Sequence, residues 1–166
     1  MVIQKIGIVI HEGVQALDVA GPLDVFAAAN AFVGEQEGYE VVLVGASQNP
    51  VRASNGMQIT ADLTFEEAAG GFDILLVAGG PGLPDKSPNP VMQEWLRQAP
   101  WRASIYGAVC TGTFALGDAG LLDGKRVTTH WRDAKKLAER FPGAIVEHDR
   151  IHVRDGRLVT SAGVTA

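Results

Sequence analysis

The 166-residue chain carries a net charge of −5, with 46% hydrophobic and 20% charged residues, which is the composition of a folded globular protein. The acidic balance argues against nucleic-acid binding by this chain alone, because phosphate binding needs a basic face. A single cysteine excludes an internal disulfide and favours a reducing cytoplasm, and no apolar run approaches the roughly 18 residues of a membrane span. We therefore expect one domain, residues 1–166, in a cytoplasmic protein.

Buried strands and amphipathic helices alternate along most of the chain. The expected strands are 6–10, 39–45, 72–80, 103–109 and 124–130, and the expected helices are 20–32, 89–99, 111–122 and 131–141. Two hairpins are expected where Asn55-Gly56 and Asp155-Gly156 separate extended segments. This order predicts an α/β fold: a three-layer sandwich with a mostly parallel sheet, helices on both faces and antiparallel hairpin additions.

Functional residues are expected at the carboxyl ends of the parallel strands, where open α/β sheets place their sites. Three stretches meet this condition: the loop after Ile10, the glycines Gly79 and Gly80, and Cys110. The glycine pattern matches neither dinucleotide-binding nor phosphate-loop motifs, so no cofactor is expected. His148 and His152 flank a probable strand break rather than sharing a helical face, so no metal site is expected either.

Cys110 stands where a strand turns into a helix, with Ala108 and Gly112 two residues to either side. Small residues at these offsets permit the tight turn of a nucleophile elbow. The positive end of the following helix predicts a thiol pKa clearly below about 8.5. The alternative is a buried structural cysteine, since cysteine is among the most buried residue types.

Three other positions have both a functional and a structural interpretation. Asp18 precedes a helix expected to start near Pro22, and its carboxylate could either stabilise that helix start or exchange a proton with the thiol. The glycines Gly79 and Gly80 could form an oxyanion hole or only a tight turn. His130, expected at the end of a strand, could orient or deprotonate the thiol or simply pack there.

The end of the chain, "LVTSAGVTA", stops just past a strand with no closing helix. Part of one sheet face would then be bare, and exposed apolar patches favour association. We expect either a partner subunit on this face or a chain that continues beyond Ala166.

Four stretches together resemble the ThiJ/PfpI superfamily, which has a class I glutamine amidotransferase-like, flavodoxin-like fold. They are "DVAGPLDVF", "LLVAGGPG", "AVCTGTFALGDAGLLDGKRVTTHW" and "DGRLVTSAG". The resemblance implies that Asp18 faces Cys110 and that Gly80 and Thr111 supply backbone N–H groups around the thiol. It also assigns Gly79 and Gly163 to the ligand-binding part of the site.

Within the superfamily, Thr111 stands where the protease-like branch has a histidine, so peptidase activity is not expected. Two branches remain compatible with "LDVAGP", "CTG" and "TTHW", and residues 129–166 resemble the first of them more closely, so a regulator domain is expected and the enzyme is the alternative. The first is the ligand-sensing and dimerisation domain of AraC-type transcription regulators, which would bind a small molecule, form a homodimer and reach DNA only through an absent C-terminal domain. The second is an isonitrile hydratase-like enzyme with Cys110 as nucleophile and Asp18 as general acid and base.

Overall fold

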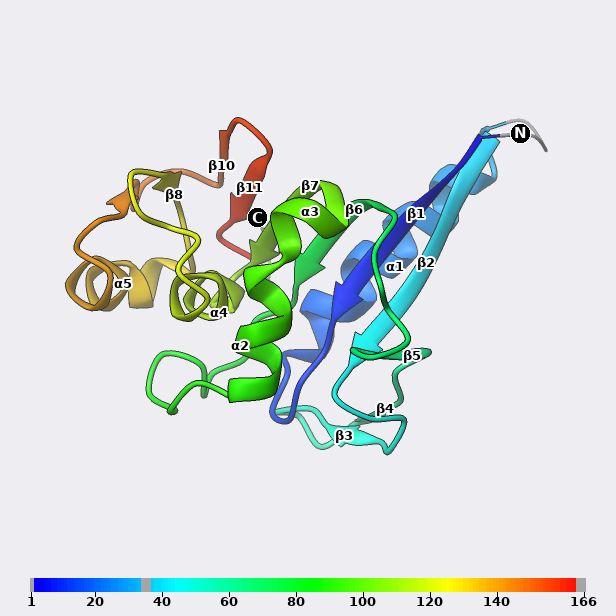
Figure 1. Cartoon of the computed structure of the whole chain (residues 1–166), viewed down its shortest axis with the longest axis horizontal. Helices are drawn as coiled ribbons and strands as arrows, with labels where there is room; N and C mark the ends of the chain where they lie inside the picture. Colours follow the sequence, from blue (N-terminus) through cyan, green and yellow to red (C-terminus); the bar gives the residue numbers. More distant parts are fainter. Residues whose placement is uncertain (1, 34–36, 164–166) are drawn as a thin grey trace.

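The computed structural model describes residues 2–33 and 37–163. Its centre is a seven-stranded sheet in the order β10-β11-β7-β6-β1-β2-β5 (Figure 1). The strands are β1 (Val2–Val9), β2 (Glu37–Gly45), β5 (Leu63–Thr64), β6 (Phe72–Val77), β7 (Ala103–Val109), β10 (His152–Asp155) and β11 (Leu158–Ser161). All neighbours pair in parallel except β10 with β11.

Helices cover both faces of this sheet. The helices are α1 (Ala16–Asn30), α2 (Pro90–Arg97), α3 (Ala99–Arg102), α4 (Gly112–Asp118) and α5 (Ala134–Arg140), with a 3₁₀ turn, η1 (Trp131–Asp133), before α5. Figure 1 shows α1 behind the sheet and α2 and α3 in front of it. Alternate residues of β1 therefore enter different cores: Ile8 packs on the α1 side and Val9 on the other.

The predicted fold class is confirmed: the sheet is mostly parallel, sandwiched between helices, and extended by an antiparallel hairpin at its edge. The strand expected at 103–109 has these bounds in the structure. Both hairpins are present, the first formed by β3 (Val51–Arg52) and β4 (Gln58–Ile59). Asn89 caps α2, as its position before Pro90 predicts, and its Oδ1 accepts the N–H groups of Val91 and Met92.

The first helix starts earlier than predicted. Pro22 was interpreted as its first residue, but α1 begins at Ala16 and Pro22 lies inside it. The start is fixed by tertiary structure, because the N–H of Gln15 donates to the carbonyl of Gly79 over 2.7 Å. Asp18 consequently belongs to the first helical turn rather than to the preceding loop, which holds its carboxylate at a fixed position.

The strand predicted at 124–130 is also shorter in the structure. β8 covers only Arg126–Val127 and pairs in parallel with β9 (Ile145–Val146). The ladder stops because the next N–H, that of Thr128, donates to the side chain of Thr160 over 2.8 Å. His130 is therefore not a strand end: it is the N-cap of η1, where it accepts the N–H of Arg132.

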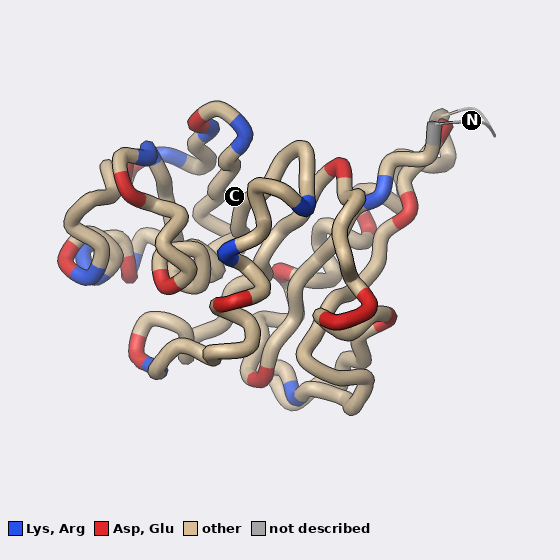
Figure 2. The backbone as a smooth tube through the Cα atoms, in the orientation of Figure 1, with Lys and Arg blue, Asp and Glu red and all other residues tan. Residues whose placement is uncertain are grey.

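Charge is distributed unevenly along the chain. Residues 1–84 carry two Lys or Arg against ten Asp or Glu, whereas residues 85–166 carry twelve against nine, so most of the blue segments in Figure 2 belong to the C-terminal half. Within the described residues, no helix has the length and apolar character that crossing a bilayer requires.

Candidate functional site

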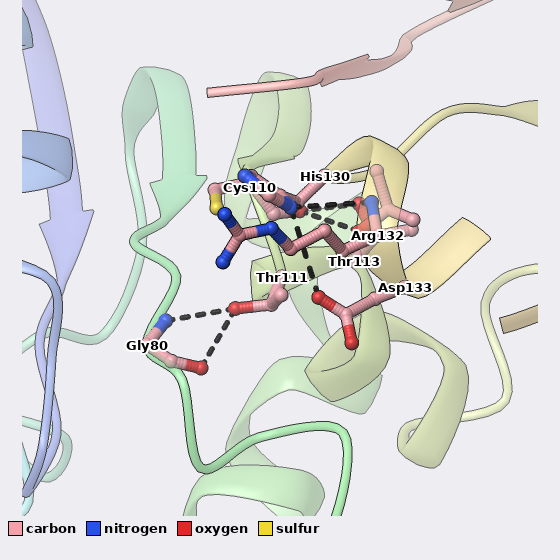
Figure 3. Close-up of polar contacts among 8 residues, drawn as sticks. Gly80, Cys110, Thr111, Thr113, His130, Arg132 and Asp133 are labelled. Carbon is pink, nitrogen blue, oxygen red and sulfur yellow. Dashed lines mark hydrogen bonds and ion pairs between the residues drawn. The ribbon is translucent and has the colours of Figure 1, made fainter. Parts of the chain in front are cut away.

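A cavity of about 500 Å³ lies where β6 and β7 end, within the size range of small-molecule sites. Its inner wall, as we call it, consists of Gly80, Cys110 and Thr111, which follow the two strands. Its outer wall consists of His130, Arg132 and Asp133, which belong to η1 and its cap. Figure 3 shows both walls around one space. The topology thus brings segments about 50 residues apart in sequence to one edge of the sheet.

Cys110 forms the turn between β7 and α4. Its φ of 57° makes it the one non-glycine residue with positive φ in the described chain. This conformation costs about 1–3 kcal/mol and persists only where the surroundings fix it. Here the N–H of Cys110 donates to the carbonyl of Ser161 over 2.9 Å, and its own carbonyl accepts the hydroxyl of Thr129 over 2.9 Å. The backbone is thus held so that the thiol stands at the top of the sheet.

Glycines surround this turn because no side chain fits there. A Cβ on Gly163, whose φ is +74°, would lie 2.3 Å from the Cβ of Cys110. A Cβ on Gly79 would lie 2.6 Å from Oδ2 of Asp18 and 2.8 Å from the Cβ of Cys110. Gly79 therefore occupies the space between the carboxyl and the cysteine, and any larger residue would push them apart.

Asp18 is buried in the first turn of α1, with 2% of its surface exposed. Its Oδ2 accepts the N–H of Gly79 over 3.1 Å, and its side chain hydrogen-bonds the thiol of Cys110. The structure thus joins a carboxyl and a thiol, from α1 and from the end of β7, into one buried dyad. Such a pair can pass a proton in either direction.

The pKa of Cys110 shifts in the direction opposite to the prediction. Burial, followed by the negative charge of Asp18, raises the pKa of the thiol from 9.0 to about 12, although hydrogen bonds from Thr111 oppose the shift. The expected lowering assumed a helix dipole, but α4 has only seven residues and the thiol is 5% exposed. The expectation of a low-pKa thiol is therefore wrong, and Cys110 holds its proton at neutral pH.

Gly80 and Thr111 are joined by two hydrogen bonds. The N–H of Gly80 donates to Oγ1 of Thr111 over 2.9 Å, and that hydroxyl donates back to the carbonyl of Gly80 over 2.8 Å. The N–H of Thr111 hydrogen-bonds the Cys110 sulfur. One of the two expected N–H donors thus faces the thiol, whereas the N–H of Gly80 already has an acceptor that a ligand would have to replace.

His130 shares the cavity with Cys110 but makes no hydrogen bond to it within the described chain. Its Nδ1 lies 3.8 Å from the Asp133 carboxylate, and its ring stacks against Trp131 with centroids 5.7 Å apart. The contacts of its ring are therefore with η1. Its role as a base for the thiol stays a prediction.

Sequence reasoning missed the charged side chains of the outer wall and Gln15, which also lines the cavity. Arg132 and Asp133 were treated as part of the helix that follows, and no motif marks them. His11 is half-buried near Asp18: its Nε2 lies 3.1 Å from the carbonyl of Ala78, and burial lowers its pKa. Over residues 2–33 and 37–163, no His, Cys, Asp and Glu cluster could hold a metal ion.

Curated relatives match over most of the chain. A Streptomyces lividans protein described as an uncharacterized protein in the cpoL 5' region is 41% identical over 83% of this chain and 95% of its own length. An isonitrile hydratase of Pseudomonas putida is 38% identical over 98% of this chain and 66% of its own length. The transcriptional regulator CdhR of Pseudomonas aeruginosa is 32% identical over 93% of this chain, which spans only 44% of that regulator.

Solved structures share the fold. A ThiJ/PfpI family protein from Pseudomonas syringae has a TM-score of 0.85 and 29% identity, covering 99% of this chain and 64% of that one. An AraC family transcriptional regulator from Pseudomonas putida has a TM-score of 0.81 at 21% identity, covering 96% of this chain and 84% of that one, which shows likeness of fold. The family model for DJ-1/PfpI matches residues 4–166. The chain therefore belongs to the DJ-1/PfpI family.

Proposed function

We propose that this protein is a hydratase of the isonitrile hydratase type, in which Cys110 adds to the isonitrile carbon and Asp18 carries the protons. The observation that carries the proposal is the buried Asp18–Cys110 dyad, with the thiol protonated and hydrogen-bonded to the carboxyl. The similarity to the Pseudomonas putida enzyme over 98% of the chain supports it.

A protonated thiol suits this chemistry. The isonitrile carbon must gain a sulfur and a hydrogen at the same atom, so the reaction consumes the S–H proton rather than only a thiolate. In the first step the C–S bond forms while Asp18 accepts the thiol proton and delivers a proton to the same carbon, giving a thioimidate. The N–H of Thr111, already at the sulfur, keeps the nucleophile in place.

Hydrolysis of the thioimidate releases the product and regenerates the thiol. With Asp18 as base, a water oxygen attacks the thioimidate carbon and the nitrogen takes a proton. The C–S bond then breaks, the sulfur regains its proton, and an N-substituted formamide leaves. Isonitrile and water are consumed in equal amounts, and no oxidant or reductant is needed. The cavity of about 500 Å³ opens on the thiol and admits both.

The test is formamide production from cyclohexyl isocyanide, followed by mass spectrometry. We expect Cys110→Ala and Asp18→Asn to lower turnover by at least about 100-fold, a typical contribution of a nucleophile or general acid. Asp24→Asn is the matched control, since Asp24 is exposed on the same helix. Equal turnover by Cys110→Ala and the unaltered protein would contradict the proposal.

A second readout separates lost chemistry from lost folding. Asp18 raises the pKa of Cys110, so Asp18→Asn lowers it and exposes more thiolate at a given pH. The variant should therefore react faster with iodoacetamide while losing hydration. A variant that has merely unfolded would show fast alkylation together with a lost thermal transition.

A second candidate is the ligand-sensing domain of an AraC-type regulator. The resting, protonated thiol favours it, because a sensor needs a site that binds without consuming its ligand. Similarity to the regulators CdhR and GbdR of Pseudomonas aeruginosa, over 93% and 98% of this chain, supports it. This candidate expects a homodimer that binds a small molecule and releases no formamide from isonitriles. The turnover experiment therefore decides between the two candidates.

A further inference from the structure

Arg132 is placed at the cavity by η1. It lines the same space as Cys110 and Thr111, and Figure 3 shows its side chain extended from η1 toward the side on which the Cys110 sulfur lies. Its backbone N–H donates to Nδ1 of His130 over 3.4 Å, which fixes the start of the turn. Its guanidinium lies over the ring of Trp131, 5.2 Å from the centroid. The contact with the Trp131 ring therefore holds the guanidinium beside the turn.

The guanidinium of Arg132 also differs from the others in the chain. Each of the other arginines places its guanidinium within hydrogen-bond or ion-pair distance of a protein oxygen. Over the described residues, Arg132 has neither a carboxylate nor a carbonyl at such a distance. In a chain with a net charge of −5, its five N–H donors remain available at the opening of a thiol site.

The nearby carboxylates do not pair with the guanidinium of Arg132. The carboxylate of Asp133 lies 3.8 Å from the ring of His130 and makes no ion pair with Arg132. The buried Asp18 is engaged with Gly79 and Cys110. Arg132 is also not among the groups that shift the pKa of Cys110, which are burial, Asp18 and Thr111. Its charge therefore acts on what enters the cavity rather than on the thiol.

We infer that Arg132 is a specificity-determining residue that selects small ligands bearing a carboxylate and directs their other end to Cys110. The planar guanidinium fork matches a carboxylate with two parallel hydrogen bonds. The identity of the natural substrate rests on the proposed function. If the protein is an isonitrile hydratase, its preferred isonitriles carry an acidic group. A neutral isonitrile would lack the contact that orients it.

Two alkylating reagents of nearly equal shape test the inference without requiring turnover. Iodoacetate and iodoacetamide both form a C–S bond to Cys110 and release iodide and a proton, but only iodoacetate carries a carboxylate. We expect Arg132→Gln to lower the iodoacetate-to-iodoacetamide rate ratio about tenfold, the effect of losing one charge-assisted contact. Arg132→Lys should retain part of the preference, because it keeps the charge but not the fork.

Arg97→Gln is the matched control, since Arg97 is exposed on α2 and pairs there with Glu94. Its rate ratio should equal that of the unaltered protein. An unchanged ratio in Arg132→Gln would overturn the inference. So would an equal loss of rate with both reagents, because Arg132 would then act on the thiol and not on the charge of the ligand.

Binding to the Cys110→Ser variant provides a measurement that does not depend on thiol reactivity. At equal concentration and constant ionic strength, propionate should raise the thermal midpoint more than propionamide, and Arg132→Gln should remove the difference. Equal shifts would again overturn the inference. If the protein prefers the carboxylate ligand but produces no formamide, only the proposed hydratase activity is refuted. If it produces formamide but shows no preference for the carboxylate, only the role of Arg132 is refuted.

Discussion

The two walls of the cavity are built in different ways. The inner wall is buried and closely supported: its cysteine stands in a positive-φ turn, Gly79 and Gly163 pack directly behind it, and the hydroxyl of Thr129 bonds its carbonyl. The outer wall comes from the short η1 turn and its cap, and its side chains, which include Arg132 and Asp133, are exposed or half-buried. Its contacts are weaker, such as the 3.8 Å approach of Asp133 to His130.

This difference separates two requirements of a thiol site. The dyad of Asp18 and Cys110 needs fixed distances, since proton transfer depends on them, and close packing supplies these distances. Recognition of the ligand needs a surface that can change residue by residue without loss of the fold, and an exposed turn provides it. Changes in the inner wall should therefore affect stability and chemistry together, whereas changes in the outer wall should affect selectivity alone.

The largest effect is expected from Gly79→Ala, directly behind the inner wall. The new Cβ would lie under 3.0 Å from three atoms, belonging to Asp18, Cys110 and Thr111. We expect a loss of about 3 kcal/mol in the free energy of unfolding and about 100-fold in turnover, because the dyad is pushed apart. Urea denaturation and the formamide assay measure the two effects.

Gly21→Ala is the control for that substitution. Gly21 lies in α1, and a Cβ there would meet nothing within 4 Å. This variant should be as stable as the unaltered protein or more stable by up to about 1 kcal/mol, since alanine favours the helix. Comparable losses in both variants would show that the inner wall is no more constrained than the helix surface.

A smaller effect is expected from alkaline pH. The thiol of Cys110 has a pKa of about 12 in the folded protein against 9.0 ordinarily, so only the unfolded chain releases this proton just above pH 9. The stabilising contribution is complete below pH 9 and falls by about 1.4 kcal/mol for each pH unit above it, up to pH 12. Denaturation of the Cys110→Ala variant should lack this component. Equal slopes for the two proteins would contradict the buried, protonated thiol.

The sequence predicted the sheet and the thiol turn well because both depend on local patterns. Strand 103–109 is mostly apolar, and Cys110 follows it between small residues. The start of α1 was wrong because it depends on a hydrogen bond to Gly79, far away in the chain. The thiol pKa was wrong for the same reason: the helix dipole is a local feature, whereas burial and the approach of Asp18 arise only from folding. Arg132 was missed because its position is significant only in the folded cavity.

The smallest effect is expected from Asp133→Asn in the outer wall. The side chain is 26% exposed, and within the part of the chain that the structure describes its carboxylate contacts only the ring of His130, so its loss should change the free energy of unfolding by no more than about 0.5 kcal/mol. It does, however, place a negative charge in the cavity that Arg132 also lines. Its removal should raise the iodoacetate-to-iodoacetamide rate ratio about twofold, opposite in sign to Arg132→Gln. A large loss of stability, or a ratio that falls, would show that the outer wall supports the fold in the same way as the inner wall.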